Sequence, residues 1–341
     1  MARVTLDAVR KRYGSGGRSH QALDGVSLQI DEGEFVALLG PSGSGKTTLL
    51  RAIAGLEAID AGTIDIGGER VAGPGLHQPP EARRLAVVFQ NHALWPHMNV
   101  HDNVLFPLHQ AGLSGAAARE RVLQALAAVE LGGLHERFPG QLSGGQKQRV
   151  ALARAMVGAP RVILFDEPLA SLDVALRRGM MRHIARARSA EAAMVYVTHN
   201  QEEALALADR VAVLFDGRIE QLDAPQLLCR QPRTERVAQF VGAGNVLDAQ
   251  AVATTGAGEV QLEIGGHRFV ARCRSAPANA EVRVCIAPSA LVPAPPGPGL
   301  LQARLEFAFF QGHGYAAEAT LTAPGATVGL HLPASARPRT G

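Results

Sequence analysis

Eight residues near the N-terminus restrict the possible folds of this chain more than any other segment. They match the pattern GxxxxGK[ST], and they are Gly40, Pro41, Ser42, Gly43, Ser44, Gly45, Lys46 and Thr47. The apolar run 35–39 before them predicts a strand buried on both faces, and the helix-like stretch after them ends at Gly55. A strand, a glycine-rich loop and a helix in this order predict an α/β fold that binds a nucleoside triphosphate.

The loop supplies the groups that a triphosphate needs. Its glycines allow backbone N–H groups to surround the β-phosphate, and the helix that starts near Lys46 adds the positive end of its dipole. We expect Lys46 to contact the β- and γ-phosphates, Thr47 to ligate Mg²⁺ and Thr48 to complete the ATP-binding segment. A glycine-rich turn without a ligand is the alternative, and the flanking strand and helix argue against it.

Two carboxylates, Asp166 and Glu167, end a second apolar run at residues 162–165. Side chains alternate along a strand, so the two need not have the same role. Asp166 is predicted to lie near Mg²⁺, and Glu167 to accept a proton from the water that attacks the γ-phosphate. An acidic pair at a strand end is often only solvated or a helix cap, so this assignment depends on the phosphate loop.

Three single residues complete the predicted nucleotide site. His199 follows the predicted strand 194–198, at the same sheet edge as Glu167, where it can contact the γ-phosphate and hold the attacking water. Gln90 ends the run 85–89, and its amide can contact Mg²⁺ or the water. Tyr13 can stack on adenine. Alone, each of these residues is weak evidence.

The pentapeptide 142–146, Leu-Ser-Gly-Gly-Gln, opens a clear helix and predicts a second anion site. Its proposed ligands are Ser143, Gly144, Gly145 and Gln146. One chain is not expected to close both helix ends on one phosphate, whereas two chains related by two-fold symmetry place each Ser143 end over the other's Lys46. A helix merely capped by serine is the alternative.

The chain to about residue 240 alternates between strand-like and helix-like segments, which predicts a doubly wound domain. Strands are predicted at residues 4–9, 22–30, 35–39, 162–165, 194–198 and 211–215, and helices at 174–189 and 201–208. Residues 91–158 are predicted as a helical subdomain, with 116–131 as its clearest helix. Leu123, Leu126, Ala127 and Glu130 follow the helical spacing there.

After residue 241 the composition shifts toward Gly, Ala and Pro with short strands, which predicts a separate β domain at 241–341. Five prolines within 288–298 exclude regular structure from that segment.

Charge and hydropathy limit the partners of the chain. With 34 Lys and Arg against 31 Asp and Glu, the net charge is +3, and no basic run indicates nucleic acid. No segment approaches the roughly 18 apolar residues that span a bilayer. The N-terminus lacks the apolar core of a signal peptide, so we expect a cytosolic chain. Cys229, Cys273 and Cys285 have neither paired nor metal-ligand spacing and are predicted to be reduced.

Over nearly all of residues 1–240 the chain resembles the nucleotide-binding subunits of ABC transporters. The resemblance implies a P-loop NTPase (RecA-like) core and identifies residues 40–47 as the Walker A loop, Gln90 as the Q-loop glutamine and 142–146 as the signature. It implies that Asp166 is the Walker B aspartate, Glu167 the catalytic base and His199 the switch histidine. Tyr13 resembles the adenine-stacking aromatic. Residues 171–173 resemble the D-loop, which places Asp173 at the partner copy's nucleotide.

The tail resembles the OB-like regulatory (TOBE) domain of bacterial import ATPases. This group implies a homodimer on the cytoplasmic face of the inner membrane, two transmembrane permease subunits and, indirectly, a solute-binding protein. The run 89–100, with Trp95, is most similar to ferric ion importers, while polyamine, sulfate, sugar or phosphonate import remain alternatives. A soluble ABC ATPase acting on DNA or ribosomes is a remote alternative, because one phosphate loop is present and no sustained heptad repeat. A purely regulatory nucleotide binder is disfavoured by the presence of both Glu167 and His199.

Overall fold

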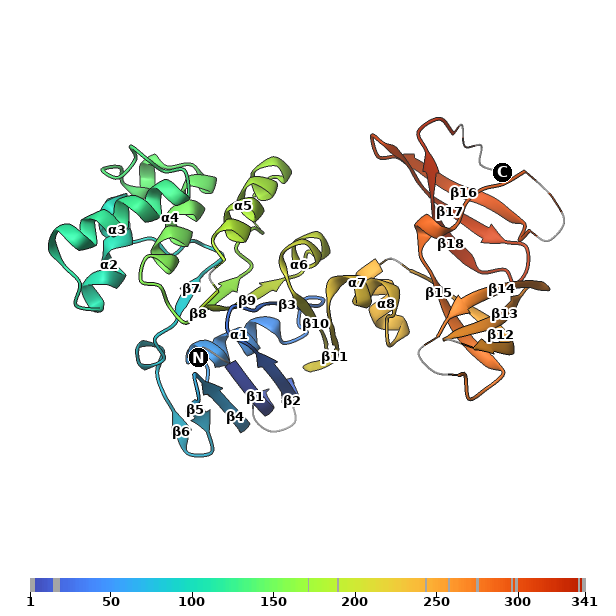
Figure 1. Cartoon of the computed structure of the whole chain (residues 1–341), viewed down its shortest axis with the longest axis horizontal. Coiled ribbons are helices and arrows are strands. Elements are labelled where there is room, and N and C mark those ends of the chain that lie inside the picture. Colours follow the sequence, from blue (N-terminus) through green and yellow to red (C-terminus); the bar gives the residue numbers. More distant parts are fainter. Residues whose placement is uncertain are drawn as a thin grey trace. The chain divides into compact units, whose positions relative to one another are not determined.

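The computed structural model describes residues 4–14, 19–170, 172–188, 190–242, 244–256, 258–273, 276–295, 297, 300–336 and 338 (Figure 1). Contacts divide the chain into two compact units, Met1–Pro225 and Gln226–Gly341. This division comes earlier than the predicted boundary near residue 240, because the helix α8 (Glu235–Gly242) packs against the first strand of the second unit, β12 (Asn245–Gly256).

The first unit is built on a six-stranded sheet in the order β11-β10-β3-β9-β8-β7. The strands are β3 (Phe35–Leu39), β7 (Ala86–Val88), β8 (Val162–Asp166), β9 (Ala193–Thr198), β10 (Arg210–Phe215) and β11 (Arg218–Asp223). All run parallel except β11, which pairs antiparallel with β10. Since parallel strands end at one edge, the residues that follow β3, β8 and β9 come together there.

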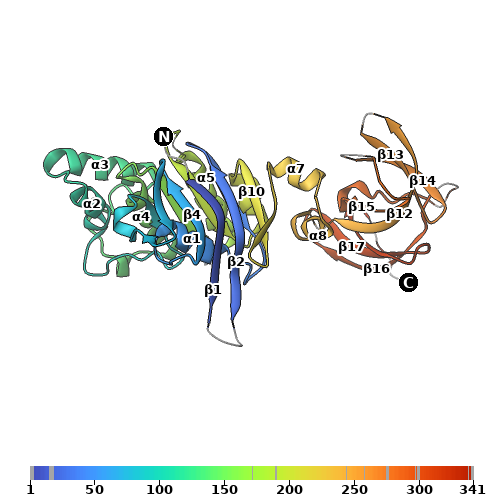
Figure 2. The ribbon, with the colours of Figure 1, turned by 90° about the horizontal axis from the view of Figure 1, so that it is seen from below.

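The helix α1 (Lys46–Ala54) lies between this sheet and a second, antiparallel sheet (Figures 1 and 2). The second sheet has the order β2-β1-β4-β5-β6, with β1 (Val4–Tyr13), β2 (His20–Ile30), β4 (Ala61–Ile66), β5 (Glu69–Gly73) and β6 (Leu76–His77). Strand β1 extends beyond its predicted end at residue 9, because its pairing with β2 continues to Tyr13 opposite His20.

On the other face of the six-stranded sheet lie α4 (Gly144–Met156), α5 (Val174–Arg186) and α6 (Gln201–Leu207). The helices α2 (Val100–Gln110) and α3 (Gly115–Ala128) pack on α4, and the short 3₁₀ turns η2 (Pro80–Ala82) and η3 (Pro139–Gln141) lie elsewhere in the unit. Residues 91–99 are not helical, so the predicted start of the helical region is corrected to Val100, where the Asn99 side chain accepts the Asp102 N–H at 2.8 Å.

The predicted apolar stripe on α3 is also corrected. Ala118, Val122 and Leu126 are buried, whereas Leu123 is 50% exposed. Glu130 lies beyond the end of the helix with a positive φ. The prediction is therefore confirmed for Leu126 and wrong for Leu123 and Glu130, because the buried face of the helix includes Val122 instead of Leu123.

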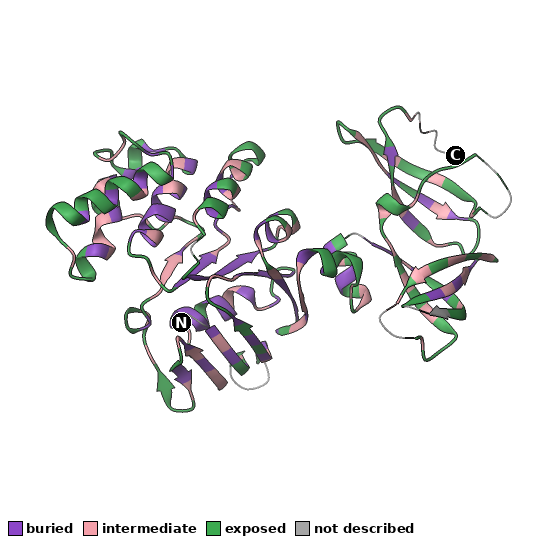
Figure 3. Cartoon of the chain, in the orientation of Figure 1, coloured by how far each residue is buried: buried purple, intermediate pink, exposed green. Residues whose placement is uncertain are grey.

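Successive residues on the central strands belong to two different hydrophobic cores. Leu164 and Val195 pack with α1, while Phe165 and Tyr196 pack with the helices of the opposite face. Figure 3 shows how continuously these strands are buried. The sheet therefore joins a core that supports the phosphate loop to a core that supports the helical subdomain.

The second unit comprises most of α7 (Pro225–Arg230), α8 and two small antiparallel sheets. One has the order β14-β13-β12-β15, with β13 (Glu259–Ile264), β14 (His267–Arg272) and β15 (Glu281–Ile286); the other is β16 (Ala303–Phe310), β17 (Gly314–Leu321) and β18 (Thr327–Pro333). Leu247 and Leu262 of the first sheet share a core with Leu321 and Val328 of the other. In the described part of the proline-rich segment, the 3₁₀ turn η4 (Pro288–Ala290) is the only regular element. The predicted α/β core, helical subdomain and C-terminal β domain are thus confirmed.

Candidate active site

The phosphate loop, residues 40–47, connects β3 to α1 as predicted. Gly45 caps α1 with a φ of 101° and no side-chain hydrogen bond, so the first N–H groups of the helix stay available to an anion. A Cβ on Gly45 would lie 2.4 Å from the carbonyl oxygen of Ala22, and one on Gly40 would lie 2.3 Å from that of Leu214. Close backbone approach therefore requires glycine at both positions.

Lys46 is almost fully buried inside this loop. Its Nζ donates to the carbonyl oxygens of Gly40 at 2.9 Å and Pro41 at 2.8 Å. Burial lowers the pKa of Lys46, while the nearby carboxylates of Glu167 and Asp166 act to raise it. The ammonium group therefore sits where it can meet phosphate oxygens and is close to both strand-end acids.

Thr47 and Asp166 approach each other across the loop. The Thr47 hydroxyl lies 3.5 Å from Oδ1 of Asp166, and burial raises the pKa of that carboxyl group. A hydroxyl and a carboxylate oxygen at this spacing are ligands of the type that Mg²⁺ prefers.

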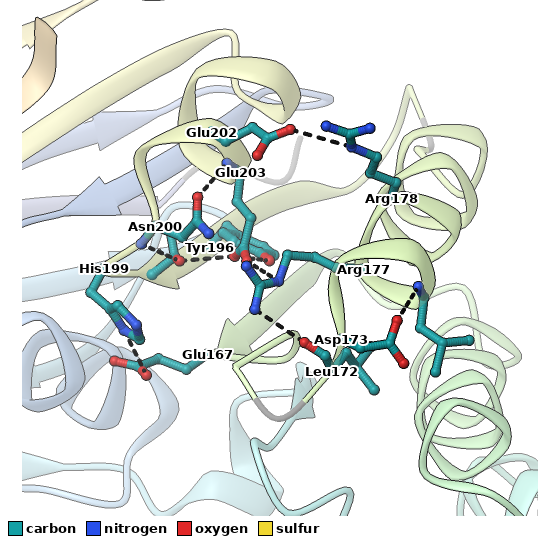
Figure 4. A network of polar contacts seen from close by, with 12 residues as sticks. Glu167, Leu172, Asp173, Arg177, Arg178, Tyr196, His199, Asn200, Glu202 and Glu203 are labelled. Carbon is teal, nitrogen blue, oxygen red and sulfur yellow. Dashed lines mark hydrogen bonds and ion pairs between the residues drawn. The ribbon is translucent and has the colours of Figure 1, made fainter. Parts of the chain in front are cut away.

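Glu167 and His199 meet at the carboxyl ends of β8 and β9 (Figure 4). The Glu167 backbone has a φ of 45°, and its N–H donates to the carbonyl of Val197 at 3.0 Å. His199 Nδ1 lies 3.1 Å from Glu167 Oε2, and the imidazole is more than half exposed. A carboxylate held by an exposed imidazole beside a phosphate loop can act as a general base toward water.

The predicted partner-facing residues lie at exposed helix ends. Ser143 caps α4: its Oγ accepts the Gln146 N–H at 3.3 Å, and its own N–H donates to the Gln146 side chain at 2.9 Å. Asp173 caps α5 by accepting the Leu176 N–H at 2.9 Å. Among the residues that the structure describes, no hydrogen bond or ion pair joins the Ser143 end to the phosphate loop. Ser171 lies outside the described residues.

Tyr13 and Gln90 are both exposed. The Tyr13 ring has one face near the Lys11 ammonium, 5.3 Å from the ring centroid. Gln90 lies two residues beyond the end of β7. The chain after it is held on α4, where Arg154 donates to the carbonyls of Ala93 at 2.6 Å and His92 at 2.9 Å.

Sequence reasoning missed three polar residues behind the site, of which Arg154 and Glu203 are buried and Arg177 is half-buried. Arg154, Arg177 and Glu203 were not singled out, although Arg154 stands within an otherwise apolar stretch of α4, residues 150–155. A charged side chain on the buried side of a helix was the signal that could have found it.

The comparisons with known proteins agree with this geometry. The model of the ABC transporter family matches residues 23–170. A spermidine/putrescine import ATP-binding protein of Methylococcus capsulatus is 47% identical over 270 residues, which cover 79% of this chain and 68% of that protein. An Fe(3+) ions import ATP-binding protein of Agrobacterium fabrum is 41% identical over 312 residues, covering 91% of this chain and 86% of that protein.

Among solved structures, the ATP-binding cassette MJ0796, a dimer in a post-hydrolysis state bound to ADP and Pi, superposes with a TM-score of 0.58. It is 35% identical in sequence, and the match covers 65% of this chain and 98% of the cassette. Since the family match spans the phosphate loop and both strand-end acids, and the relatives are matched over two thirds or more of their length, this chain belongs to the ABC transporter family and is an ABC-type import ATPase.

Proposed function

We propose that two copies of this chain bind two ATP molecules at their shared interface, and that hydrolysis there drives a membrane permease. The observation that carries the proposal is the Glu167–His199 pair, 3.1 Å apart beside the Lys46 loop. The exposed caps at Ser143 and Asp173 support a second copy, because each chain offers helix ends that its own phosphate loop does not use.

Each chain would bind the phosphates of one ATP with residues 40–48, with Lys46 contacting the β- and γ-phosphates. Glu167 would accept a proton from the attacking water, and His199 would fix the position of Glu167 relative to the γ-phosphate. Tyr13 would stack on adenine. The partner would close the site with Ser143, Gly144, Gly145, Gln146 and Asp173.

Thr47, Asp166 and Gln90 are the residues that would hold Mg²⁺, which supplies positive charge at the phosphates when bound. The described residues contain no cluster of three or more His, Cys, Asp or Glu side chains that could hold a metal ion. The ion would therefore share its coordination with phosphate oxygens and water, as Mg²⁺ commonly does.

The helical subdomain and the segment after Gln90 would contact two permease subunits at the cytoplasmic face of the inner membrane, with a solute-binding protein as an indirect partner. None of the helices within the described residues is long and apolar enough to cross a bilayer. The attachment of His92 and Ala93 to α4 supports this route, because a change at Gln90 would move the same helix that carries Ser143.

Ferric ion is the solute we propose, because similarity to the Fe(3+) import protein covers 91% of this chain, against 79% for the spermidine/putrescine import protein. Polyamine is the second candidate, favoured by the higher identity of 47% to the spermidine/putrescine import protein. Uptake of labelled ferric ion and of labelled spermidine, in cells with and without this chain and its permease, separates the two.

The catalytic assignment is tested by Glu167→Gln in the full chain. Loss of the general base should lower ATP turnover by about 10²-fold or more while ATP still binds, because this type of catalysis contributes about 10²–10⁴-fold. Glu202→Gln, at an exposed carboxylate of α6, is the control and should keep the wild-type rate. A Glu167→Gln protein that turns over ATP normally would refute the role of Glu167.

A further inference from the structure

A buried carboxylate lies behind the exposed Glu167–His199 pair (Figure 4). The Glu203 side chain, on α6, is only 3% exposed, and its Oε2 accepts hydrogen bonds of 2.8 Å from both the Tyr196 and the Thr198 hydroxyl groups. Burial raises the pKa of Tyr196 well above its usual value, so its hydroxyl group remains a donor at neutral pH. One oxygen of Glu203 is thus fully occupied by β9.

These bonds fix the backbone on both sides of His199. The Thr198 hydroxyl donates to Glu203 and also accepts the Asn200 N–H at 2.9 Å. The Asn200 side chain in turn accepts the Glu203 N–H at 3.2 Å and caps α6. The two residues that flank His199, Thr198 and Asn200, are therefore both hydrogen-bonded to Glu203.

The other oxygen of Glu203 faces α5. Glu203 Oε1 lies 3.5 Å from Nε of Arg177, and the Arg177 guanidinium donates to the carbonyl of Leu172 at 3.1 Å. Leu172 directly precedes Asp173, the cap of α5. Polar contacts thus run from the Leu172 carbonyl through Arg177 and Glu203 to the Thr198 hydroxyl (Figure 4). Asp173 and His199 are the next residues of the chain at the two ends of this path.

We propose that Arg177 and Glu203 form a positioning pair that couples the Asp173 segment to His199. This rests on the proposed function, in which Asp173 faces the partner's nucleotide and His199 faces the chain's own. A displacement of Leu172 and Asp173 at the partner's site would move Arg177, and through Glu203 would move the segment that carries His199. The pair therefore makes water activation in one site sensitive to closure on the other. Neither residue touches ATP.

Glu202 and Arg178, the sequence neighbours of Glu203 and Arg177, form a matched control pair. Glu202 and Arg178, on the same two helices, lie 3.8 Å apart with side chains 61% and 67% exposed, where an ion pair contributes little. We would compare Glu203→Gln and Arg177→Met with Glu202→Gln and Arg178→Met, measuring kcat, KM for ATP and thermal unfolding of the full chain. Glu203→Gln and Arg177→Met should each lower kcat by about 10- to 100-fold, since a misplacement of about 1 Å can cost about 10²-fold. KM should change little, and the control variants should match wild type.

The double variant Arg177→Met/Glu203→Gln separates positioning from simple charge compensation. Removing both charges leaves no unpaired buried charge, so thermal stability should return toward wild type. A kcat that stays low in this stable protein supports the proposal, whereas a kcat restored together with stability overturns it. If either single variant fails to fold, the double variant still provides this comparison.

The outcome also distinguishes this inference from the proposed function. If wild type hydrolyses ATP and Glu167→Gln does not, but Arg177→Met and Glu203→Gln keep the wild-type kcat, only the positioning role fails. If Glu167→Gln hydrolyses ATP normally, the proposed function itself fails. A further measurement tests the link between Arg177 and the Asp173 segment. In the Glu167→Gln background, Arg177→Met should reduce the ATP-dependent dimer fraction measured by light scattering. An unchanged dimer fraction would overturn this link.

Discussion

At the scale of single residues, Lys46 shows how function can oppose stability. Its ammonium group is buried among loop carbonyls, and burial lowers its pKa, which means that the fold disfavours the charged form. In the proposed function this charge serves phosphate binding and not the stability of the fold.

We expect Lys46→Met to weaken ATP binding by about 10- to 100-fold, since hydrogen bonds to charged groups contribute about 1.5–3 kcal/mol. Its thermal unfolding midpoint should stay near that of wild type, because removal of a buried charge offsets the loss of the hydrogen bonds to the Gly40 and Pro41 carbonyls. Calorimetry and ATP titration measure the two effects. A large loss of stability would show that the lysine holds the loop together.

Glu167 is the second residue whose local geometry serves the site. A non-glycine residue at a φ of 45° costs about 1–3 kcal/mol. The hydrogen bond from its N–H to the carbonyl oxygen of Val197 on β9 stabilises this conformation. The position of the carboxylate is thus set by the backbone as well as by His199.

At the scale of elements, α4 carries both the Ser143 end and the attachment of the segment after Gln90. Arg154 is 9% exposed, its guanidinium lies 4.8 Å from the centroid of the Trp95 ring, and burial lowers its pKa to about 10. It remains a cation at neutral pH, with carbonyl acceptors and an aromatic face as partners.

We expect Arg154→Met to destabilise the protein by about 2–4 kcal/mol, since it leaves two carbonyls unsatisfied and removes a cation–π contact. The midpoint of thermal unfolding should fall by several degrees. Arg119→Met, at an exposed position of α3, is the control and should stay within about 0.5 kcal/mol of wild type. Equal midpoints for the two variants would contradict the anchoring role of Arg154.

Sequence patterns predicted the elements whose signals are local. The phosphate loop, the strand before it and the stop at Gly55 depend on adjacent residues, and the structure has them as predicted, with Gly55 in the left-handed region at φ 82°. Leu123 was misplaced because its neighbour Val122, which is equally apolar, faces the core instead. Glu203 and Arg177 could not be predicted, because their pairing depends on how α5 and α6 pack together.

At the scale of the whole molecule, the proposed function requires an active site shared between two copies, to which the exposed Ser143 and Asp173 ends would contribute. Lys46→Met and Ser143→Arg chains should each be inactive alone, because each breaks both sites of its own dimer. Mixed in equal amounts, they should regain activity, at most about a quarter of the wild-type rate, since half of the dimers are mixed and each of these holds one intact site of two.

Steady-state ATPase assays of the separate and mixed proteins test this prediction. Lys46→Met mixed with the double variant Lys46→Met/Ser143→Arg is the control, because no intact site can form. Activity in that control, or none in the complementing mixture, would argue against a shared site.

The two cores on either face of the six-stranded sheet also determine which mutations its strands tolerate. Leu164 and Phe165 are neighbours in the chain, yet they belong to opposite cores. Inserting or deleting one residue in β8 would exchange the two faces, so the nucleotide side would receive the side chains made for the helical side. The number of residues in these strands is consequently constrained more strictly than the identity of their apolar side chains.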